Sequence, residues 1–371
     1  MKSIQKAIHR AIMLGIVNQT LNASLNTLKG PILITGHSGF MGTWLTFILE
    51  NLNIECVGIS LPAPEQSLYN FANRKDKIQE FFYDLNDHKN TNKIIKKIRP
   101  SVVIHLAAQP LVLQSYTNIY ETFSTNVIAT MNVLQSCLEC DSIKAVLVST
   151  TDKVYENLEK NKAFTESDPL RGNDPYSCSK VATESVIVGW QKLVSLSSGP
   201  MISSIRCGNV IGGGDLATDR LLPDLIRGFM GETTTSIRNA TSTRPWQHVL
   251  DPLYGFLQVL QKNLEGSHVT SINFGPDSEG LSVKRVTELA CEYWPQKTGV
   301  SFVPELKKFE TNKLNLSSRF AKEFLNWHPV FSQEESIEST INWWKRFHLN
   351  HELAELICRD QVKNYLDQKA N

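Results

Sequence analysis

A glycine-rich turn near the start of the chain places the strongest constraint on its fold. Its glycines, Gly36, Gly39 and Gly42, have the spacing Gly-x-x-Gly-x-x-Gly. The short apolar run Pro31 to Ile34 precedes the turn, and the helical pattern Trp44 to Leu52 follows it. Glycines between a strand and a helix let the backbone approach a pyrophosphate at the helix N-terminus. The spacing departs from the commoner Gly-x-Gly-x-x-Gly, but its position predicts a dinucleotide cofactor rather than a purely structural turn.

Four later apolar runs have the length of buried strands: Glu55 to Ile59, Phe81 to Leu85, Val102 to Gln109 and Ala145 to Ser149. Helical stretches such as Thr122 to Leu138 separate them, and strands joined by helices form a parallel sheet covered on both faces. We therefore predict an α/β fold, a Rossmann-type doubly wound parallel sheet with a smaller C-terminal α/β substrate-binding region. Ligands of such sheets bind outside the carboxyl ends of the strands.

The expected organisation has four parts, and 371 residues with 41% hydrophobic content are sufficient to bury a full core. Residues 1–29 have apolar side chains at helical spacing from Ile4 to Ile16 and predict an amphipathic helical extension. Residues 30–205 are expected to form mainly the cofactor-binding domain with the catalytic residues. Residues 206–347 are expected to bind substrate and to interlace with that domain, and residues 348–371 to form a charged helical tail.

Composition argues against several classes of protein. Lys plus Arg number 38 against 37 Asp plus Glu, so the net charge does not favour a nucleic-acid partner. No run is long and apolar enough to span a bilayer, and charges interrupt the N-terminal stretch where a signal peptide would be apolar. The seven cysteines lack the paired spacing of a metal site, and Cys137-x-x-Cys140 is interpreted as two incidental thiols. We expect a cytoplasmic protein with reduced thiols.

Further cofactor contacts are expected in the glycine-rich turn and at the strand ends: His37, Phe40, Met41, Asp84, Leu85, Leu106, Ala107 and Ala108. Asp84 ends the third predicted strand, where an acid can meet the adenine. An acid usually ends the second strand and accepts the ribose 2′-hydroxyl of NAD, but here that strand runs into Ser60-Leu61-Pro62 with neither acid nor arginine. His37 is expected near this ribose, and the choice between NAD and NADP stays open.

The candidate catalytic pair is Tyr176 and Lys180, which open a helical run after the loop Asn173-Asp174-Pro175. Positions i and i+4 share one helix face, and a nearby cation favours phenolate over phenol, so Tyr176 is a candidate general base. The fifth predicted strand ends in Thr151-Asp152-Lys153, which we expect beside this helix. A hydroxyl, a carboxyl and an amine next to the pair form an acid–base constellation.

Several motifs follow one another over residues 31–347. They are Thr35-Gly-x-x-Gly-Phe-x-Gly, His105-Leu-Ala-Ala-Gln, Thr150-Thr-Asp-Lys-x-Tyr-Glu-Asn157, Asp174-Pro-Tyr-Ser-x-Ser-Lys180, Arg206-x-Gly-Asn-Val-Ile-Gly-Gly-Gly-Asp215, Asp219-Arg-Leu-x-Pro223, Arg244-Pro-Trp-Gln-His-Val-Leu250, Leu325-Asn-Trp-x-Pro329 and Trp343-Trp344. In combination they resemble the extended short-chain dehydrogenase/reductase family, and within it the CDP-glucose 4,6-dehydratase branch.

The resemblance implies an NAD-dependent hydro-lyase of deoxysugar biosynthesis for surface polysaccharide. In this family Tyr176 and Lys180 would both contact the cofactor. Tyr176 would take the proton of the sugar 4-hydroxyl as hydride leaves C4, Lys180 would hold the ribose and lower the phenol pKa, and Thr151 would bond the same oxygen. Water is then lost from C5 and C6, and the hydride returns to C6. Asp152 matches the position that protonates the departing 6-hydroxyl. Lys153 stands where related dehydratases carry a Glu as the C5 base, and a neutral amine at this place would remove the C5 proton instead.

The substrate contacts expected are Gln109, Asn209, Arg220, Arg244 and His248. Arginine offers paired donors to phosphate oxygens, so the two arginines are candidates for the phosphates and nucleobase. His248 lies in an apolar stretch, which favours packing over catalysis. Gly212-Gly213-Gly214 predicts a flexible turn. The resemblance also implies a homodimer or homotetramer formed through helix pairs on the outer face of the sheet.

Two other functions remain open. A nucleotide-sugar 4-epimerase or a reductase would need Tyr176 and Lys180 but no Asp152-Lys153 pair, so the presence of that pair favours dehydration. A sensor of nucleotide sugars or dinucleotides would have lost a catalytic group, whereas Thr151 and both members of the Tyr/Lys pair are present.

Overall fold

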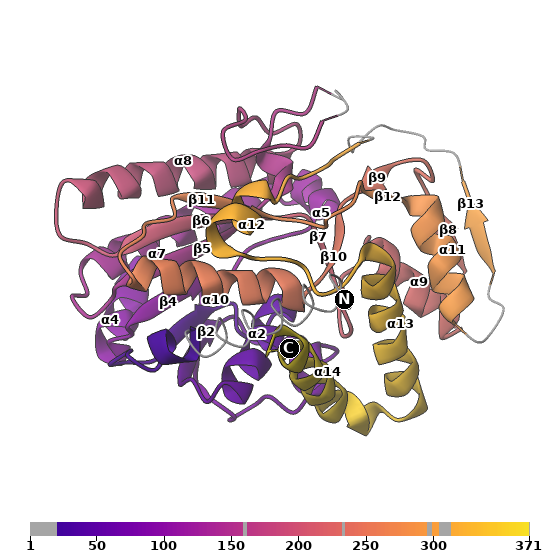
Figure 1. Ribbon diagram of the computed structural model, residues 1–371, viewed down its shortest axis with the longest axis horizontal. Helices are drawn as coiled ribbons and strands as arrows, with labels where there is room; N and C mark the ends of the chain where they lie inside the picture. Colours follow the sequence, from indigo (N-terminus) through magenta and orange to yellow (C-terminus); the bar gives the residue numbers. More distant parts are fainter. Residues whose placement is uncertain (1–20, 159–161, 232–233, 295–298, 304–312, 371) are drawn as a thin grey trace, which may run out of the picture.

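A seven-stranded parallel sheet forms the centre of the molecule, in the order β11-β6-β5-β4-β1-β2-β3 (Figure 1). The computed structural model describes residues 21–158, 162–231, 234–294, 299–303 and 313–370. The strands of this sheet are Ile32–Thr35 (β1), Cys56–Ser60 (β2), Gln79–Phe82 (β3), Val102–His105 (β4), Ala145–Thr151 (β5), Met201–Cys207 (β6) and Ser271–Phe274 (β11). In the register of β1, Ile34 lies opposite Gly58 on one side and Ile104 on the other. The predicted doubly wound parallel sheet is confirmed.

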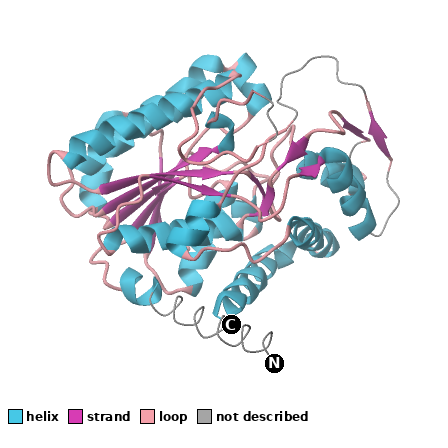
Figure 2. Ribbon diagram, turned by 45° about the horizontal axis from the view of Figure 1, so that its top comes forward, coloured by secondary structure: helices cyan, strands magenta, loops and turns pink. Residues whose placement is uncertain are grey.

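Helices cover both faces of the sheet (Figure 2). One layer contains α2 (Phe40–Asn51), α10 (Leu250–Leu264) and α14 (Ala354–Ala370), and the other contains α4 (His88–Ile98), α7 (Ala129–Leu138) and α8 (Pro175–Ser195). Successive side chains of a strand alternate between these layers: Ile32 and Ile34 pack in the first, and Leu33 packs in the second. The continuous apolar runs of the sequence are explained by this burial on both faces.

The smaller region is built of short elements at the carboxyl end of the sheet (Figure 1). Its helices are α9 (Leu221–Phe229), α11 (Val283–Tyr293) and α13 (Gln333–Leu349). Its strands pair as β7 (Asn209–Ile211) with β10 (Trp246–His248), β9 (Thr243–Arg244) with β12 (Leu281–Ser282), and β8 (Thr235–Ile237) with β13 (Val300–Phe302). The remaining helices are α3 (Leu68–Phe71), α5 (Val112–Thr117), α6 (Ile119–Phe123) and α12 (Arg319–Leu325), with single turns at η2 (Asp152–Val154) and η3 (His351–Leu353).

Two element boundaries differ from the predictions, and one predicted element is not described. The third strand covers Gln79–Phe82, so Asp84 lies in the loop beyond it. The helical stretch Thr122 to Leu138 is interrupted by a π-helical turn, η1 (Ser124–Ile128), before α7 begins. The amphipathic pattern from Ile4 to Ile16 falls outside the described residues.

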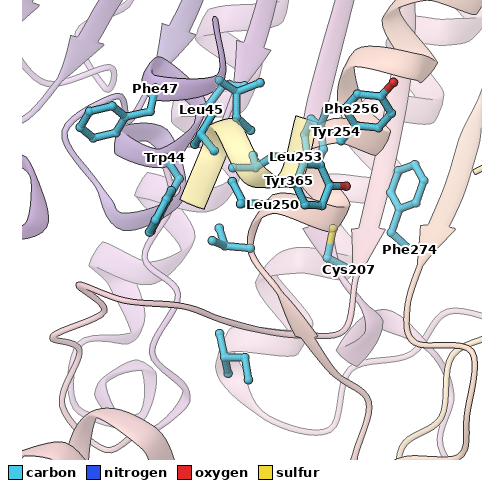
Figure 3. Packing of buried hydrophobic residues seen from close by; sticks show 14 of the residues in the cluster. Trp44, Leu45, Phe47, Cys207, Leu250, Leu253, Tyr254, Phe256, Phe274 and Tyr365 are labelled. Carbon is cyan, nitrogen blue, oxygen red and sulfur yellow. The ribbon is translucent and has the colours of Figure 1, made fainter. Parts of the chain in front are cut away.

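The C-terminal helix is part of the core. Ile357, Cys358, Val362 and Tyr365 of α14 are buried in the cluster that also contains residues of α2 and α10 (Figure 3). The segment was predicted as a charged tail because its charged residues outnumber this apolar stripe. The stripe recurs at helical spacing, and it packs α14 against α2, the helix that follows the glycine-rich turn.

The Gly212-Gly213-Gly214 turn is a packed corner, which corrects the prediction of a flexible turn. A Cβ atom on Gly213 would lie 1.9 Å from the Cγ atom of Trp343, and the Gly213 carbonyl accepts a hydrogen bond from Trp44 Nε1 at 3.0 Å. Gly214 has a φ of +79°, a conformation that favours glycine. Close packing and backbone conformation therefore require glycine at this corner.

Asp251 joins the first turn of α10 to the C-terminal helix. Its carboxylate accepts hydrogen bonds from the Val330 backbone N–H at 2.7 Å and from the Tyr365 hydroxyl at 3.0 Å. The side chain is fully buried, and this burial raises its pKa to about 6, although the positive charge of Lys369 and the hydrogen bonds oppose the shift. Asp251 is therefore a buried titratable group outside the cavity described below.

The substitution Asp251→Asn is expected to change the pH dependence of stability. Because the pKa is about 6 in the folded chain and about 3.9 when unfolded, the folded state binds the proton more tightly. The wild type should therefore lose about 2 kcal/mol of stability from this group as the pH rises from 4 to 7. The variant cannot titrate, so its stability relative to the wild type should improve over that range. Urea unfolding at several pH values measures the difference, and a difference that is constant with pH would contradict the prediction.

Candidate active site

A cavity of about 1280 Å³ lies at the carboxyl ends of the central strands, between the sheet and the smaller region. The glycine-rich turn, the end of β5 and the first turns of α8 form its walls on one side, and residues of α9 and the short strands form the other. This is the place at which a doubly wound sheet binds its ligands.

The five predicted catalytic residues all line this cavity. Thr151 is the last residue of β5, and Asp152 and Lys153 begin η2 directly after it. The Thr151 hydroxyl accepts a hydrogen bond from the Lys153 backbone N–H at 3.3 Å and lies 3.1 Å from Asp152 Oδ1. Tyr176 and Lys180 face the same cavity from α8.

The start of α8 is fixed by a capping box. The Asp174 side chain accepts from the Ser177 backbone N–H at 2.8 Å, and the Ser177 hydroxyl accepts from the Asp174 N–H at 3.0 Å. Because this cap sets the first helical residue, it sets the direction of Tyr176 and, one turn later, of Lys180. The Lys180 ammonium donates to the Ser149 carbonyl at 3.3 Å, so it is held at the end of β5.

Burial dominates the proton affinity of Tyr176. It raises the pKa of Tyr176 to about 12, while a hydrogen bond with Thr151 and the positive charge of Arg220 act in the opposite direction. Arg220 is thus a cation that favours the phenolate, a part that the sequence assigned to Lys180. Tyr176 needs such cations near its oxygen to act as a base close to neutral pH.

The surroundings of Asp152 favour the neutral form of its carboxyl group. Its side chain is buried, and burial raises its pKa against the effects of Lys153, Thr151 and Arg244. Its Oδ2 atom has no hydrogen-bond partner within the part of the chain that the structure describes. A protonated carboxyl at the cavity wall can donate a proton to a leaving group.

The glycine-rich turn fits the pyrophosphate of a dinucleotide. Gly39 is the N-cap of α2, no side chain caps this helix, and its first turn contains no acid. The first N–H groups of the helix are thus available to an anion. Gly36 has a φ of +74°, and a Cβ atom on Gly42 would lie 2.1 Å from the Gly36 carbonyl oxygen. The cavity is lined by these predicted cofactor residues: Gly36, Gly39, Phe40, Met41, Gly42, Leu106 and Ala108.

His37 lies behind the turn and does not line the cavity. Its ring fills the space above Gly58, and its Nε2 atom lies 3.0 Å from Glu80 Oε2. The Tyr69 hydroxyl donates to the same carboxylate at 2.7 Å. Burial lowers the pKa of His37 although Glu80 raises it, so the ring is neutral. The structure therefore places His37 as a support of the turn rather than in the cavity wall.

Three other predicted cofactor residues also lie outside the cavity wall. Leu85 is buried in the core, and the Ala107 N–H lies 3.4 Å from the Thr35 hydroxyl. Asp84 is exposed, and its Oδ1 atom accepts from the Asn86 N–H at 2.9 Å. Of the cofactor residues predicted at the strand ends, Leu106 and Ala108 line the cavity.

Three of the five predicted substrate residues line the cavity: Asn209, Arg220 and Arg244. Arg220 precedes α9 and forms an ion pair with Asp215, with Nη1 and Oδ2 3.1 Å apart. Asp215 also accepts from the Ala217 N–H at 3.1 Å, so it is fixed within its own loop. Sequence reasoning did not single out Asp215, although it stands five residues before Arg220 in a quoted motif.

Gln109 and His248 do not line the cavity. His248 is fully buried, with ring centroids 4.8 Å from Phe331 and 6.2 Å from Trp44, and burial lowers its pKa to about 3. The structure gives it the packing position that its apolar surroundings favour. Gln109 donates through its side chain to Thr122 at 2.8 Å and thereby shapes the loop after β4, whose residues 110–113 line the cavity.

The fold and the cavity define a class of protein: an α/β enzyme whose dinucleotide-binding turn and Tyr-x-x-x-Lys pair line the same cavity. The sequence model of the family described as "NAD dependent epimerase/dehydratase family" matches residues 32–275, and the chain belongs to this family. Among the described residues, no helix combines the length and the apolar character needed to cross a membrane.

Relatives of this chain include a CDP-glucose 4,6-dehydratase from Salmonella typhimurium. It is 34% identical over 345 residues, which cover 90% of this chain and 96% of the relative. A dTDP-glucose 4,6-dehydratase from Haemophilus influenzae is 26% identical, over 84% of this chain and 97% of the relative.

Two solved structures show the same fold. A UDP-glucose 4-epimerase from Thermus thermophilus, in complex with NAD, has a TM-score of 0.75 at 20% identity, covering 85% of this chain and 99% of that one. A dTDP-glucose 4,6-dehydratase from Streptomyces venezuelae has a TM-score of 0.73 at 20% identity, covering 85% of this chain and 97% of that one.

Proposed function

We propose that the protein is a nucleotide-sugar 4,6-dehydratase that converts CDP-glucose to CDP-4-keto-6-deoxyglucose with NAD. The observation that carries the proposal is the convergence of Asp152 and Lys153 with Tyr176 in one cavity. An epimerase or a reductase of this fold needs the tyrosine but has no use for an acid and a second base beside it. The 34% identity to a CDP-glucose 4,6-dehydratase supports this choice of reaction and of nucleobase.

Each residue of the site has one role in the proposed reaction. Tyr176 takes the proton of the sugar 4-hydroxyl, Thr151 holds that oxygen by a hydrogen bond, and Lys180 holds the ribose of the cofactor. NAD, when bound, supplies the hydride acceptor for C4 and the hydride donor for C6. Lys153 removes the C5 proton, which the C4 carbonyl has acidified, and Asp152 protonates the departing 6-hydroxyl. Lys153 returns a proton to C5 when the hydride reaches C6. The product is a 4-keto-6-deoxy sugar together with one water.

The far side of the cavity supplies the contacts for the nucleotide. Arg220 and Arg244 place two guanidinium groups in the wall, and a guanidinium can donate two parallel hydrogen bonds to a phosphate group. Asn209, the first residue of β7, lines the same cavity and offers an amide to the substrate. The proposed compartment is the cytoplasm, and the proposed product serves deoxysugar biosynthesis for a surface polysaccharide.

The test is an assay of the purified protein with NAD and, in parallel, CDP-glucose, dTDP-glucose, GDP-mannose and UDP-N-acetylglucosamine. Mass spectrometry follows the loss of one water from the sugar nucleotide. Water loss confined to CDP-glucose would support both the reaction and the substrate. Conversion without loss of mass would identify an epimerase, and NAD binding without any conversion would favour a sensor.

We also propose that a second copy of this chain packs on α6, η1 and α8. These elements lie side by side and expose apolar side chains: Ile119 and Tyr120 on α6, Ile128 on η1, and Val188 and Leu193 on α8. Apolar residues that cluster on neighbouring helices mark an interaction surface. Since each copy presents the same surface, a two-fold arrangement buries both at once.

The substitution Tyr120→Asp is expected to convert the proposed dimer into monomers, because it places a charge in the centre of an apolar contact. Light scattering during size exclusion measures the mass directly. Leu349→Asp is the matched control, since Leu349 at the end of α13 is 83% exposed and Tyr120 is 86% exposed. Equal masses for the wild type and both variants would contradict this interface.

A further inference from the structure

A buried ion pair lies beneath the catalytic residues. Glu184 follows Lys180 by four residues and Tyr176 by eight, so the three side chains share one face of α8. Glu184 and Arg206 of β6 are 2% and 5% exposed, and the Nη2 and Oε2 atoms of the pair are 2.8 Å apart. The proposed reaction assigns no role to either residue.

The Glu184 carboxylate connects α8 to two strands of the sheet. Its Oε1 atom accepts from the Thr150 hydroxyl at 2.6 Å, the Ser204 hydroxyl at 2.5 Å and Arg206 Nε at 2.9 Å. Thr150 directly precedes the catalytic Thr151 on β5. These bonds therefore fix the helix that carries the Tyr/Lys pair against the strand that carries Thr151.

Arg206 is held from its other side. Its Nη1 atom donates to the Tyr155 hydroxyl at 2.9 Å and to the Glu166 carbonyl oxygen at 3.2 Å. The guanidinium thus has a fixed plane, and it presents two donors to Glu184 in a bidentate contact. The pair is a rigid connection rather than a contact between mobile side chains.

We propose that Glu184 is a positioning residue of the active site, which holds α8 on β5 and β6 and supplies the negative charge that keeps the Lys180 ammonium protonated. The proposal rests on the role given to Lys180 in the proposed function, and it does not depend on which sugar nucleotide is the substrate.

Among the titratable groups around Lys180, Glu184 is the one that provides the negative charge. The titratable groups on the elements around Lys180 include His105 of β4, Asp152 and Lys153 of η2, Tyr176 and Glu184 of α8, and Arg206 and Cys207 of β6. Burial lowers the pKa of His105 to about 3, so that ring is neutral, and burial raises the pKa values of Asp152 and Tyr176. Burial raises the pKa of Glu184 as well, but its contacts with Arg206 outweigh this effect, and Glu184 is ionised.

Lys180 is close to losing its charge. Burial lowers its pKa to about 8, and the charge of Glu184 opposes that shift. An ammonium offers three donors to ribose hydroxyls, whereas a neutral amine offers fewer. The affinity for NAD should therefore weaken as the pH rises through the pKa of Lys180. The midpoint of that change depends on whether the Glu184 carboxylate is present.

The test compares the pH dependence of NAD binding in the wild type and in Glu184→Gln, measured by calorimetry without any sugar nucleotide. In the variant the midpoint should move to lower pH by about one unit, the low end of the effect that a neighbouring opposite charge has on a pKa. Glu184→Asp keeps the charge and should restore the wild-type midpoint. Glu166→Gln is the matched control: it removes another partly buried carboxylate near Arg206 and should leave the midpoint unchanged.

Three results would overturn the proposal: a wild-type affinity that does not change with pH, a variant midpoint equal to that of the wild type, or an equal shift in Glu166→Gln. If Glu184→Gln does not fold because Arg206 loses its partner, Arg206→Gln tests the same charge from the other side: it leaves the Glu184 carboxylate without its counter-cation, and the midpoint should move to higher pH. NAD binding is read without turnover, so failure of the CDP-glucose assay would be seen separately.

Discussion

The substitution Tyr176→Phe is expected to lower kcat for the proposed dehydration by about 10³-fold, the scale of losing a positioned general base. The phenylalanine retains the ring and the packing of the first turn of α8 but has no hydroxyl to take the 4-hydroxyl proton. Because the glycine-rich turn is untouched, NAD should bind as tightly as in the wild type. Single-turnover mass spectrometry measures the rate of water loss, and calorimetry measures NAD binding.

Tyr83→Phe is the control for this substitution. It also removes the hydroxyl of a tyrosine whose oxygen is buried, but Tyr83 does not line the cavity. Its turnover should stay within a few-fold of the wild type. Retention of more than a tenth of the activity in Tyr176→Phe would show that another group takes the proton.

The second large effect is expected from Gly42→Ala, which should weaken NAD binding by about 100-fold or more. Its Cβ atom would lie 2.1 Å from the Gly36 carbonyl oxygen and 2.7 Å from the His37 Cα atom. Both are backbone atoms, so the turn must move away from α2. A misplacement of about 1 Å can cost about 10²-fold in a positioned site. Calorimetric titration with NAD gives the affinity.

Gly189→Ala serves as its counterpart. Gly189 lies inside α8, and nothing is found within 4 Å of the Cβ atom that the change would add. We expect unchanged NAD binding and a gain of about 0.5–1 kcal/mol in stability, because alanine favours a helix over glycine. Unchanged NAD affinity in Gly42→Ala would mean that the turn tolerates the shift.

Features that depend on residues close together in the chain could be predicted from the sequence. The spacing of the glycines after β1 and of Tyr176 and Lys180 on α8 each lies within eight residues, and the structure brings both to the cavity. The alternation of apolar runs and helical stretches likewise predicted the parallel sheet. Element ends were less accurate: Asp84 was placed on a strand because aromatic residues precede it, but pairing with β2 stops at Phe82.

Contacts between distant residues could not be read from the sequence. Glu80 reaches His37 only because β3 pairs beside β2, and no spacing along the chain reports that pairing. Glu184 has the same position in the helical pattern whether or not β6 brings Arg206 beneath it. His248 shares a motif with Arg244, but the two residues lie on different strands, β10 and β9, so His248 packs against Phe331 and Trp44 while Arg244 lines the cavity.

The corner at Gly213 has a consequence for any attempt to exchange parts of this enzyme. Its carbonyl is bound by Trp44, which belongs to the helix of the glycine-rich turn, and its Cα faces Trp343 of the last third of the chain. In a chimaera joined near residue 205, the turn at position 213 would come from the other protein while Trp44 came from this one, so the hydrogen bond and the packing at Gly213 would be disturbed. Retargeting the protein to another nucleotide is therefore better attempted by single substitutions in the cavity wall than by transplanting its second half.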